Sequence, residues 1–399
     1  MIKLTIKADD VVVNKIQETD DFVKFRLGKT SLVERCPYCG ALSAKVHSKR
    51  TRTVRDRPQY GKQVIVEIEK RRFKCENPEC SHRTFGERIG DLRPYQRRTD
   101  EFKYFLYSLQ KMMPSWAAAK LLAEEYKTRL SQATIYRDFI YIGKLKKKET
   151  RASENEVVAV GLDEFLRKRG REFGVALVDL RNSDIIAVEE GKKGESIRRL
   201  FEGLDTTKIE VVVIDMWRLA RSYINKLLPE AAIVVDRFHV IKEFSQPLNT
   251  LMAKVRKRQT DPIIKKLLFK KRRVILKARE TLKEEERDYL DFFLSLDEDL
   301  KTLWEFKEQL RDIYKYASDI EEARYLLENW IKQARTSGIE ELVSLARTFN
   351  RWRSEILNYF RFRVTNGKTE RAVGRIKQLQ RARCGLRNTD TLRCLVSCK

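Results

Sequence analysis

Three aspartates in one stretch of the chain each follow a short run of apolar, mostly β-branched residues. Asp163 follows residues 157–162, Asp215 follows residues 211–214, and Asp236 follows residues 233–235. Such runs form buried strands, and a charge at a strand end lies at the sheet edge where α/β folds place ligand and metal sites. Carboxylates held together in a strongly basic chain therefore predict a site for a hard cation. The alternative for each aspartate alone is that it caps the turn or helix that follows.

Length and composition favour a multi-domain globular protein. The chain has 399 residues, of which 42% are hydrophobic, enough for about two to four domains with their own cores. No apolar run is long enough to span a bilayer, and residues 1–7 alternate like an edge strand instead of forming a signal peptide. We therefore expect a protein of the cytoplasm with no membrane contact.

The net charge of +26 is concentrated in two stretches. Residues 254–279 hold twelve basic residues and one acid, and residues 361–383 hold eight and one. This predicts a phosphate-binding surface for double-stranded DNA, although a solvated helix face or an anionic membrane partner would be alternatives. The candidate DNA contacts in these stretches are Lys254, Arg256, Lys257, Arg258, Lys270, Lys271, Arg272, Arg273, Arg371, Arg375 and Lys377.

Four of the seven cysteines have the spacing of metal ligands. They form two tight pairs, Cys36 with Cys39 and Cys75 with Cys80. Two such knuckles predict a closed structural Zn²⁺ site, and the lack of a secretion signal disfavours a disulfide framework. His82 is a weaker candidate ligand because the cysteine set is already complete. The other three cysteines, Cys384, Cys394 and Cys398, are expected to be small apolar fillers.

The pattern between residues 97 and 148 is helical. Thr99 and Asp100 are expected to cap a first helix, and a second begins at 114–115. In the second helix we expect Trp116, Ala119 and Leu122 to face inward. A third helix, capped by Ser131, would present base- and phosphate-contacting side chains in its first turns, as a helix-turn-helix does. These DNA-binding candidates are Ser131, Gln132, Thr134, Tyr136 and Arg137. A plain three-helix bundle would show the same periodicity. Residues 144–148 read as a basic linker.

The next part of the chain alternates between strand and helix patterns. We expect strands over 157–162, 172–180, 184–189, 210–214 and 232–236, and helices over 195–203 and 217–228. Three consecutive strands followed by alternating helix and strand predict a mixed sheet with one antiparallel flank. This is the element order of a ribonuclease H-like fold.

From residue 240 to about 359 the chain becomes a series of charged amphipathic helices. Their expected core anchors are Trp304, Phe306, Tyr314, Tyr316, Trp330 and Trp352. A last helix over about 369–380 has Ala372, Val373, Ile376 and Leu379 on one face. Glu370 falls at the border of that face, so an ordinary solvent-facing position or an ion pair with neighbouring arginines is the alternative to a functional role.

Four motifs in order resemble the DDE transposases of bacterial and archaeal insertion sequences, and more narrowly their ISL-three family. The motifs are GLDEF at 161–165, IDMW at 214–217, VDRFHV at 235–240 and TNGKTE at 365–370. That family also begins with a four-cysteine zinc ribbon and a helix-turn-helix, and it carries a helical insertion before the Glu, so the resemblance covers nearly the whole chain. One departure is that the family typically has Gly and then Asn after the Glu, whereas Arg371, Ala372 and Val373 follow here. The later Ile376-Lys377 and Arg387-Asn388 still fit.

The resemblance implies that Asp163, Asp215 and Glu370 form a catalytic triad that holds two Mg²⁺ (or Mn²⁺) ions for DNA strand cleavage and transfer. Asp236 and His239 would be an accessory pair that shapes the site. The implied protein binds the terminal inverted repeats of an insertion sequence and acts on element ends and target DNA. Pairing two ends in one complex would require at least a homodimer.

The resulting fold prediction is a multi-domain α/β protein with five segments. They are a β-rich zinc-ribbon domain over 1–95, a helix-turn-helix domain with linker over 96–150, the first part of a ribonuclease H-like core over 151–240, an all-α insertion over 241–360 and the core's last helix and tail over 361–399. One alternative function is a zinc-ribbon, helix-turn-helix DNA-binding regulator with an inactive nuclease-like domain. Another is a metal-dependent nuclease of the same fold that cuts without joining.

Overall fold

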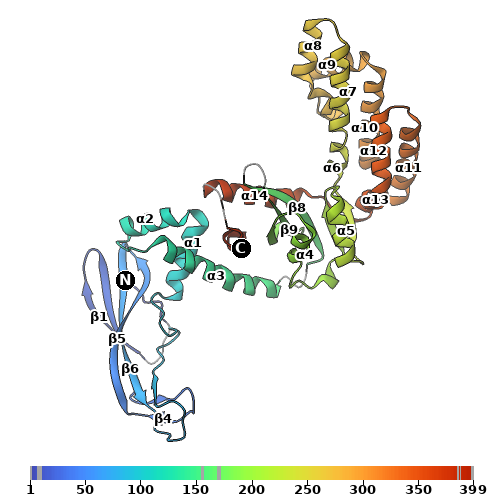
Figure 1. Cartoon of the computed structure of the whole chain (residues 1–399). Coiled ribbons are helices and arrows are strands. Elements are labelled where there is room, and N and C mark those ends of the chain that lie inside the picture. The colour runs from blue at the N-terminus through green and yellow to red at the C-terminus, as the bar shows by residue number, and fades with distance from the viewer. Residues whose placement is uncertain are drawn as a thin grey trace. The chain divides into compact units, whose positions relative to one another are not determined.

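The computed structural model describes residues 2–6, 11–153, 157–168, 172–383, 386 and 388–396. The chain divides into two compact units, and Figure 1 shows their helices and strands. The first unit comprises residues 1–150 and 379–398, and the second comprises residues 151–378. The C-terminal segment therefore belongs to the same unit as the N-terminal domains.

The first unit is built on a mixed sheet. Its strands are β1 (Val11–Glu18), β2 (Phe22–Lys29), β5 (Val46–Gln59), β6 (Lys62–Lys74) and β7 (Thr84–Gly86). They lie in the order β1-β2-β6-β5, with β7 also on β6, and only β2 and β6 pair in parallel. The alternating apolar residues of β2 and β6 point to one core, which includes Val23, Leu27, Val66 and Ile68.

The edge strand predicted at the N-terminus is wrong for its described residues, 2–6, which form no strand. Ile2, Leu4 and Ile6 do pack partly buried against the core of the sheet. Their neighbours' backbone N–H groups donate to side chains instead of a strand ladder, from Lys3 to Gln59 and from Thr5 to Asp56. The alternating sequence pattern therefore correctly indicated that Ile2, Leu4 and Ile6 pack against the sheet, but residues 2–6 do not pair with a strand.

Three helices follow the sheet, α1 (Asp100–Met112), α2 (Ser115–Glu125) and α3 (Gln132–Ser153). Thr99 caps α1 as predicted, because its side chain accepts the N–H of Phe102. The inward position predicted for Trp116 is wrong, since 56% of this residue is exposed. Leu122 is buried as predicted, together with Ala118 one helical turn before it, and Ala119 is partly buried against the same core. The segment predicted as a basic linker, 144–148, is part of α3.

A short C-terminal helix, α15 (Thr389–Val396), packs in this first unit against α1 and α3. The Tyr107 hydroxyl donates to the backbone carbonyl of Cys394 at 2.8 Å. A Cβ added at Gly143 of α3 would lie 2.4 Å from the Cys394 Sγ, so only glycine permits this approach. Cys394 is buried, which confirms it as a core filler, whereas Cys384 and Cys398 lie outside the described residues.

The second unit contains the predicted mixed sheet. Its strands are β8 (Ala159–Lys168), β9 (Glu172–Asp179), β10 (Asp184–Glu190), β11 (Val211–Ile214) and β12 (Ala232–Val235). The order is β10-β9-β8-β11-β12, antiparallel from β10 to β8 and parallel from β8 to β12. Helices α4 (Gly194–Leu200) and α5 (Arg218–Leu227) connect the later strands, with a 3₁₀ turn at Thr206–Lys208. The prediction of a ribonuclease H-like sheet is confirmed in element order and pairing.

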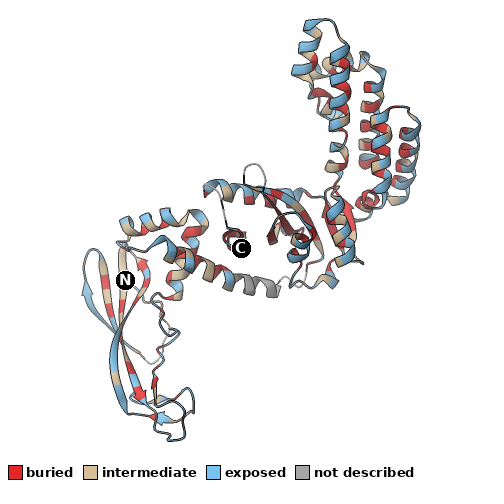
Figure 2. Cartoon of the chain, in the orientation of Figure 1, coloured by how far each residue is buried: buried red, intermediate tan, exposed pale blue. Residues whose placement is uncertain are grey.

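An all-helical block follows β12, as expected. Its helices are α6 (Arg237–Lys242), α7 (Ser245–Arg258), α8 (Pro262–Lys271), α9 (Glu284–Ser295), α10 (Glu298–Tyr316), α11 (Ile320–Thr336), α12 (Glu340–Arg351) and α13 (Arg353–Phe362), with 3₁₀ turns at Val274–Leu276 and Arg279–Thr281. Figure 2 shows buried faces running along these helices with exposed residues on the other side. This is the amphipathic arrangement that the periodicity predicted.

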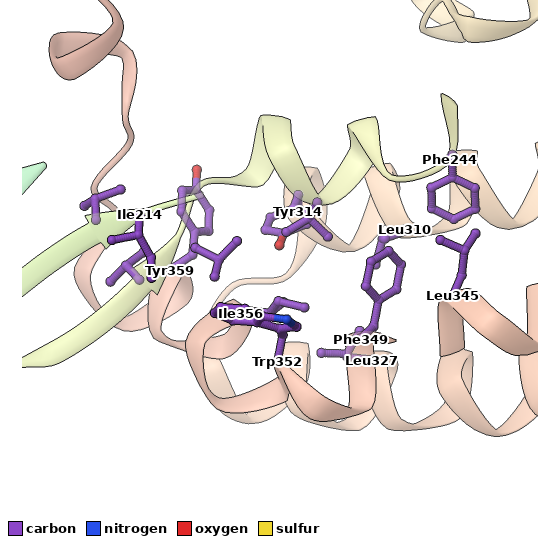
Figure 3. Close-up of a cluster of buried hydrophobic side chains, with 14 of the residues drawn as sticks. Ile214, Phe244, Leu310, Tyr314, Leu327, Leu345, Phe349, Trp352, Ile356 and Tyr359 are labelled. Atoms are coloured by element: carbon purple, nitrogen blue, oxygen red, sulfur yellow. The ribbon is translucent and has the colours of Figure 1, made fainter. Parts of the chain in front are cut away.

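The buried faces meet in one hydrophobic core of aromatic and aliphatic side chains, part of which Figure 3 shows. Tyr314, Trp330 and Trp352 are buried as predicted, and Trp304 and Phe306 are partly buried against them. Tyr316 is wrong as an anchor, because 65% of it is exposed. It is the last residue of α10, beyond the stripe of Leu310 and Ile313 that faces the core.

Helix α14 (Gly367–Ala382) follows the helical block. Ala372, Val373 and Ile376 are buried on one face, as predicted. The Lys368 Nζ donates to the carbonyl of Arg181 at 2.8 Å, and the Arg375 guanidinium donates to the carbonyl of Ser183. These contacts attach α14 to the turn between β9 and β10. Among the helices that the structure describes, none is long and apolar enough to cross a membrane.

Candidate active site

Two of the three predicted aspartates lie at the ends of neighbouring parallel strands. Asp215 directly follows β11 and Asp236 directly follows β12, and Ile214 pairs with Val235 in register. Parallel strands that end at the same level place the next residues at one edge of the sheet. The structure therefore brings these two carboxylates to the same edge.

Asp163 reaches that edge differently from the prediction. It does not end its strand, because β8 continues to Lys168 in antiparallel pairing with β9. The pairing of β8 with β11 stops at Gly161 opposite Val213. Asp163 is two residues further on and therefore on the same face as Gly161, beyond the end of β11.

The same face of β8 receives the N-terminal end of α14. A Cβ added at Gly161 would lie 1.8 Å from Thr369 Oγ1 and 3.1 Å from Asn366 Oδ1, so the missing side chain leaves the space that α14 fills. The predicted helix residue Glu370 follows Thr369 directly. Its backbone N–H donates to the carbonyl of Asn366 at 2.9 Å, which begins the helix there.

His239 lies between the side chains of two predicted triad residues. Its Nε2 is 3.1 Å from Asp215 Oδ1 and 3.6 Å from Glu370 Oε1. Asp215 and Glu370, which are far apart in sequence, are thus within hydrogen-bonding or ion-pairing reach of one nitrogen. Half of the Glu370 side chain is exposed, so this side of the group is open to solvent.

Asp236 is held by backbone groups on both sides. Its Oδ1 accepts the N–H of Phe238 at 2.8 Å and so caps α6, and its Oδ2 accepts the N–H of Asn366 at 2.6 Å. A carboxylate with both oxygens engaged has less capacity to bind a cation. Asp236 therefore acts as the helix cap that was the alternative to a metal ligand. Its side chain also links the end of β12 to the start of α14.

Asn366 is a site residue that sequence reasoning missed. It is 1% exposed, and its Nδ2 donates to Asp215 Oδ1 at 3.2 Å while its backbone N–H binds Asp236. One residue thus connects the ends of β11 and β12 with the helix of Glu370. The available signal was the Asn-Gly pair at the start of a predicted helix, since asparagine is a favoured cap there.

The charges of the group repel one another in a partly buried place. Burial, and then the negative charge of Asp215, raise the pKa of Asp163 from an ordinary 3.8 to about 6. Burial also raises the pKa of Asp215 to about 6; the hydrogen bond from Asn366 opposes this rise, while Asp236 and Glu370 add to it. The charge of Lys377 lowers the pKa of Asp163 and that of Lys242 lowers the pKa of Asp215, but neither cancels the rise. Carboxylate oxygens are the hard donors that a divalent cation of the Mg²⁺ type prefers, and such a cation would offset their repulsion.

The four predicted zinc ligands meet in the first unit. The Sγ atoms of Cys36, Cys39, Cys75 and Cys80 all lie within 4.8 Å of one another, as tetrahedral Zn²⁺ with bonds of about 2.3 Å requires. The first pair lies in the hairpin of β3 (Glu34–Arg35) and β4 (Leu42–Ser43), and the second lies between β6 and β7.

Backbone donors support the thiolates of this zinc site. The N–H of Ala41 lowers the pKa of Cys39 to about 7, and the N–H of His82 points to Cys80 Sγ at 3.5 Å. The His82 ring instead stacks on Tyr38, with centroids 3.5 Å apart. It lies outside the cysteine cluster, so the structural zinc site is a four-thiol site.

Some of the DNA contacts predicted for the helix-turn-helix are exposed to solvent and others are not. Ser131 caps α3 by accepting the N–H of Thr134 at 3.2 Å. Ser131, Gln132 and Arg137 are exposed, Thr134 is half-buried, and the Tyr136 hydroxyl is 3.0 Å from Thr391 Oγ1 of α15. The exposed residues stay predicted DNA contacts, whereas Tyr136 is engaged by the C-terminal helix.

The predicted basic contacts of the insertion also fall into two groups. Lys254, Arg258 and Lys271 pair with carboxylates of Glu341, Asp297 and Glu285. Within the described part of the chain, the structure shows no ion pair for Arg256, Lys257, Lys270, Arg272 or Arg273. In α14, Arg375 binds the Ser183 carbonyl, Lys377 lowers the pKa of Asp163 and Arg371 is exposed. Arg387 lies outside the described residues.

Comparison with known proteins agrees with this arrangement. A family model described as Transposase, of the ISL3 DDE type, matches residues 160–396. A second model, described as the zinc-finger of transposase IS204/IS1001/IS1096/IS1165, matches residues 33–80. The chain is 25% identical over 374 residues to the "Transposase for insertion sequence element IS1001" of Bordetella parapertussis, covering 91% of this chain and 88% of that protein.

Proposed function

Because the chain belongs to the ISL3 family of DDE transposases, we propose that it binds the terminal inverted repeats of its own insertion sequence and cuts and joins DNA strands there. Asp163, Asp215 and Glu370 are the proposed catalytic residues. The substrate is double-stranded DNA, both at the element ends and at the target. Two ends must be held together for joining, so the proposed active form is at least a homodimer.

The observation that carries this proposal is the convergence of the three carboxylates from different elements. Asp215 and Glu370 flank the His239 Nε2 at 3.1 and 3.6 Å, and the charge of Asp215 raises the pKa of Asp163. A fold gains no stability by burying like charges together without a cation. The family model covers all three positions, which supports a shared function for them.

The proposed Mg²⁺ ligands are the carboxylates of Asp163, Asp215 and Glu370. Bound Mg²⁺ supplies Lewis-acid activation of the attacking hydroxyl and stabilises charge on the leaving oxygen of the phosphodiester. The chain's own contribution is position. Asp163 comes from a rigid central strand, and Glu370 is held by a helix that is tied to the sheet at Gly161 and to the β9–β10 turn.

The surrounding residues set the orientation of the carboxylates. The Nδ2 of Asn366 and the Nε2 of His239 both lie near Asp215 Oδ1, so this oxygen has a fixed direction. Asp236 holds the backbone of Asn366. In this proposal Asp236, His239 and Asn366 are positioning residues, since each acts on a triad residue or its helix.

DNA recognition is proposed for the first unit. Bound zinc would hold together the small cluster in which Cys36 and Cys80 pack against Phe73 and Phe85. The start of α3 exposes Ser131, Gln132 and Arg137. Exposed polar residues at the start of such a helix suit contact with base edges and phosphates. The zinc-finger family model over residues 33–80 supports this assignment.

The test is a strand-cleavage and strand-transfer assay with Mg²⁺ on DNA that carries the element's own ends. Asp163→Ala should abolish cut and joined products while binding to the ends is retained. Glu164→Ala is the matched control, because Glu164 is the next residue of β8 and is exposed. Specific binding by the wild type without any cleavage would overturn the catalytic proposal and favour a DNA-binding regulator.

A second test concerns the basic insertion. Replacing Lys257, Lys270 and Arg273 by alanine removes three cations without ion-pair partners in the described chain, so the slope of log K against log salt should become shallower by about 2 to 3. The control replaces Lys254, Arg258 and Lys271, which removes equal charge but affects paired residues. Equal slopes for both triple variants would contradict DNA contact at these residues.

A further inference from the structure

The outer side of α8 exposes two large apolar side chains. Ile263 is 76% exposed and Phe269 is 53% exposed. In this helix only Leu268 is fully buried, and Ile264 and Leu267 are partly buried against the core. The helix therefore has an inward apolar side and, separately, two apolar side chains that are more than half exposed.

Phe269 is surrounded by cationic groups. The guanidinium carbons of Arg256 and Arg272 lie 5.3 and 4.6 Å from the centroid of its ring. Lys265 and Lys266 precede it by four and three residues, which places them beside it on the helix surface. The structure thus presents an aromatic ring within a basic surface.

The cations of this surface are not neutralised by the chain. In the described ranges no ion pair involves Lys257, Lys265, Lys266, Lys270 or Arg273. Neighbouring cations at the edge of the same region do find carboxylates, as Lys254 does with Glu341 at 2.7 Å and Arg258 with Asp297 at 2.8 Å. Lys271 of α8 also pairs, with Glu285 at 3.5 Å. Lys265, Lys266 and Lys270, beside Phe269 on α8, form no ion pair within the described chain, which is the charge pattern of a binding site for a polyanion.

An aromatic ring among cations selects a particular form of DNA. Lysines and arginines bind phosphates of any DNA, whereas an exposed ring adds affinity by stacking on a base. The faces of bases inside a duplex are already covered by their neighbours. Unpaired bases have free faces, and a membrane surface would require a continuous apolar stripe, which α8 turns inward.

We propose that the exposed side of α8 binds unpaired bases of a DNA strand, with Phe269 stacking on a base and Lys257, Lys265, Lys266, Lys270 and Arg273 contacting the phosphates. This inference rests on the proposed function, because strand cleavage creates the ends at which bases become unpaired. It assigns Phe269 and α8 to the recognition of such ends. The base contact is independent of sequence, since every base has a face that stacks.

The experiment compares two DNAs of the same sequence, a blunt duplex and a duplex with a short single-stranded overhang that contains 2-aminopurine. The full-length zinc-loaded protein is used without Mg²⁺, so that no strand is cut. Affinity is measured by fluorescence anisotropy of an end label, and stacking by the emission of 2-aminopurine. We expect the wild type to bind the overhang DNA about five- to tenfold more tightly and to quench the base analogue.

Phe269→Ala should remove both the preference and the quenching while blunt-duplex affinity changes less than about twofold. Phe269→Trp should keep both, and Phe269→Leu should lose them, because leucine is apolar without a stacking face. Tyr325→Ala is the matched control, since Tyr325 is an exposed aromatic of α11 in the same unit.

A wild type that binds both DNAs equally would overturn the inference, as would a preference that survives in Phe269→Ala or Phe269→Leu. Each of these results leaves duplex binding intact and so leaves the proposed function standing. Absence of binding to the blunt duplex carrying the element ends would instead count against the proposed function itself.

Discussion

Replacing Asp163 by asparagine should make the metal-free protein more stable while it removes activity. The folded chain holds the Asp163 carboxyl with a pKa of about 6 instead of 3.8, because of burial and the nearby charge of Asp215. The folded state therefore binds a proton more tightly than the unfolded state, and ionisation at neutral pH destabilises it. Asparagine has nearly the same shape and no charge.

The magnitude follows from the pKa. A change from 3.8 to about 6 corresponds to about 3 kcal/mol, and solvent that still reaches the carboxylate reduces this to about 2 kcal/mol. For a unit of this size, that raises the melting temperature by about 4–8 °C. The penalty is absent below pH 4, develops as the pH rises from about 4 to 6, and is complete above it. The gain in Asp163→Asn should therefore be full at pH 8 and smaller at pH 5.

The assay is thermal unfolding by calorimetry in buffer freed of Mg²⁺ by ion exchange, because a soluble chelator would also remove zinc from the ribbon. Glu164→Gln is the control, since Glu164 is exposed and its pair with Lys192 at 3.3 Å lies at the surface, so its melting temperature should stay within about 1 °C. Added Mg²⁺ should stabilise the wild type more than Asp163→Asn. A melting temperature for Asp163→Asn at or below that of the wild type at pH 8 would refute the reasoning.

Three further predictions concern single contacts. Gly161→Ala should displace α14 and cost about 1–3 kcal/mol, because its Cβ would lie 1.8 Å from Thr369 Oγ1; calorimetry should show partial rescue in the double variant with Thr369→Ala, and no rescue would contradict the contact. Asn366→Ala should raise the Mg²⁺ concentration for half-maximal cleavage about tenfold, because Asp215 loses a hydrogen bond of 3.2 Å; an unchanged Mg²⁺ dependence would count against its positioning role. Cys39→Ser should lower bound zinc to well below one ion per chain by elemental analysis, and retention of full zinc would remove Cys39 from the ligand set.

Much of the site could be predicted because local patterns carry it. Apolar runs predicted the strands that end before Asp215 and Asp236, and pair spacing predicted the four zinc ligands, which meet within 4.8 Å. Prediction failed where pairing partners decide the outcome. The sequence predicted that β8 ends before Asp163, because the residues are apolar only up to that point. In the structure β8 continues to Lys168, because it stays paired with the antiparallel strand β9.

Side-chain direction was also harder to predict than the elements themselves. Trp116 and Tyr316 are large aromatic residues, and helical periodicity and size predicted that they lie inside, but both are more than half exposed. Whether an aromatic residue is buried depends on which stripe of its helix has a neighbour to pack against. The exposure of Phe269 could not be predicted from the sequence for the same reason.

The sequence by itself determined the elements of this protein, its zinc knuckles and the candidate carboxylates, because these follow from periodicity, ligand spacing and charge over short distances. The tertiary structure alone decided that Asn366 joins Asp215 to Asp236 and that Gly161 admits Thr369. It also decided which cations find a carboxylate, as Lys254, Arg258 and Lys271 do, and which of the described cations, such as Lys265, Lys266 and Lys270, do not. Those facts depend on which distant residues approach within a few ångströms. No local pattern contains that information, since it arises only when the sheet and the helical block pack.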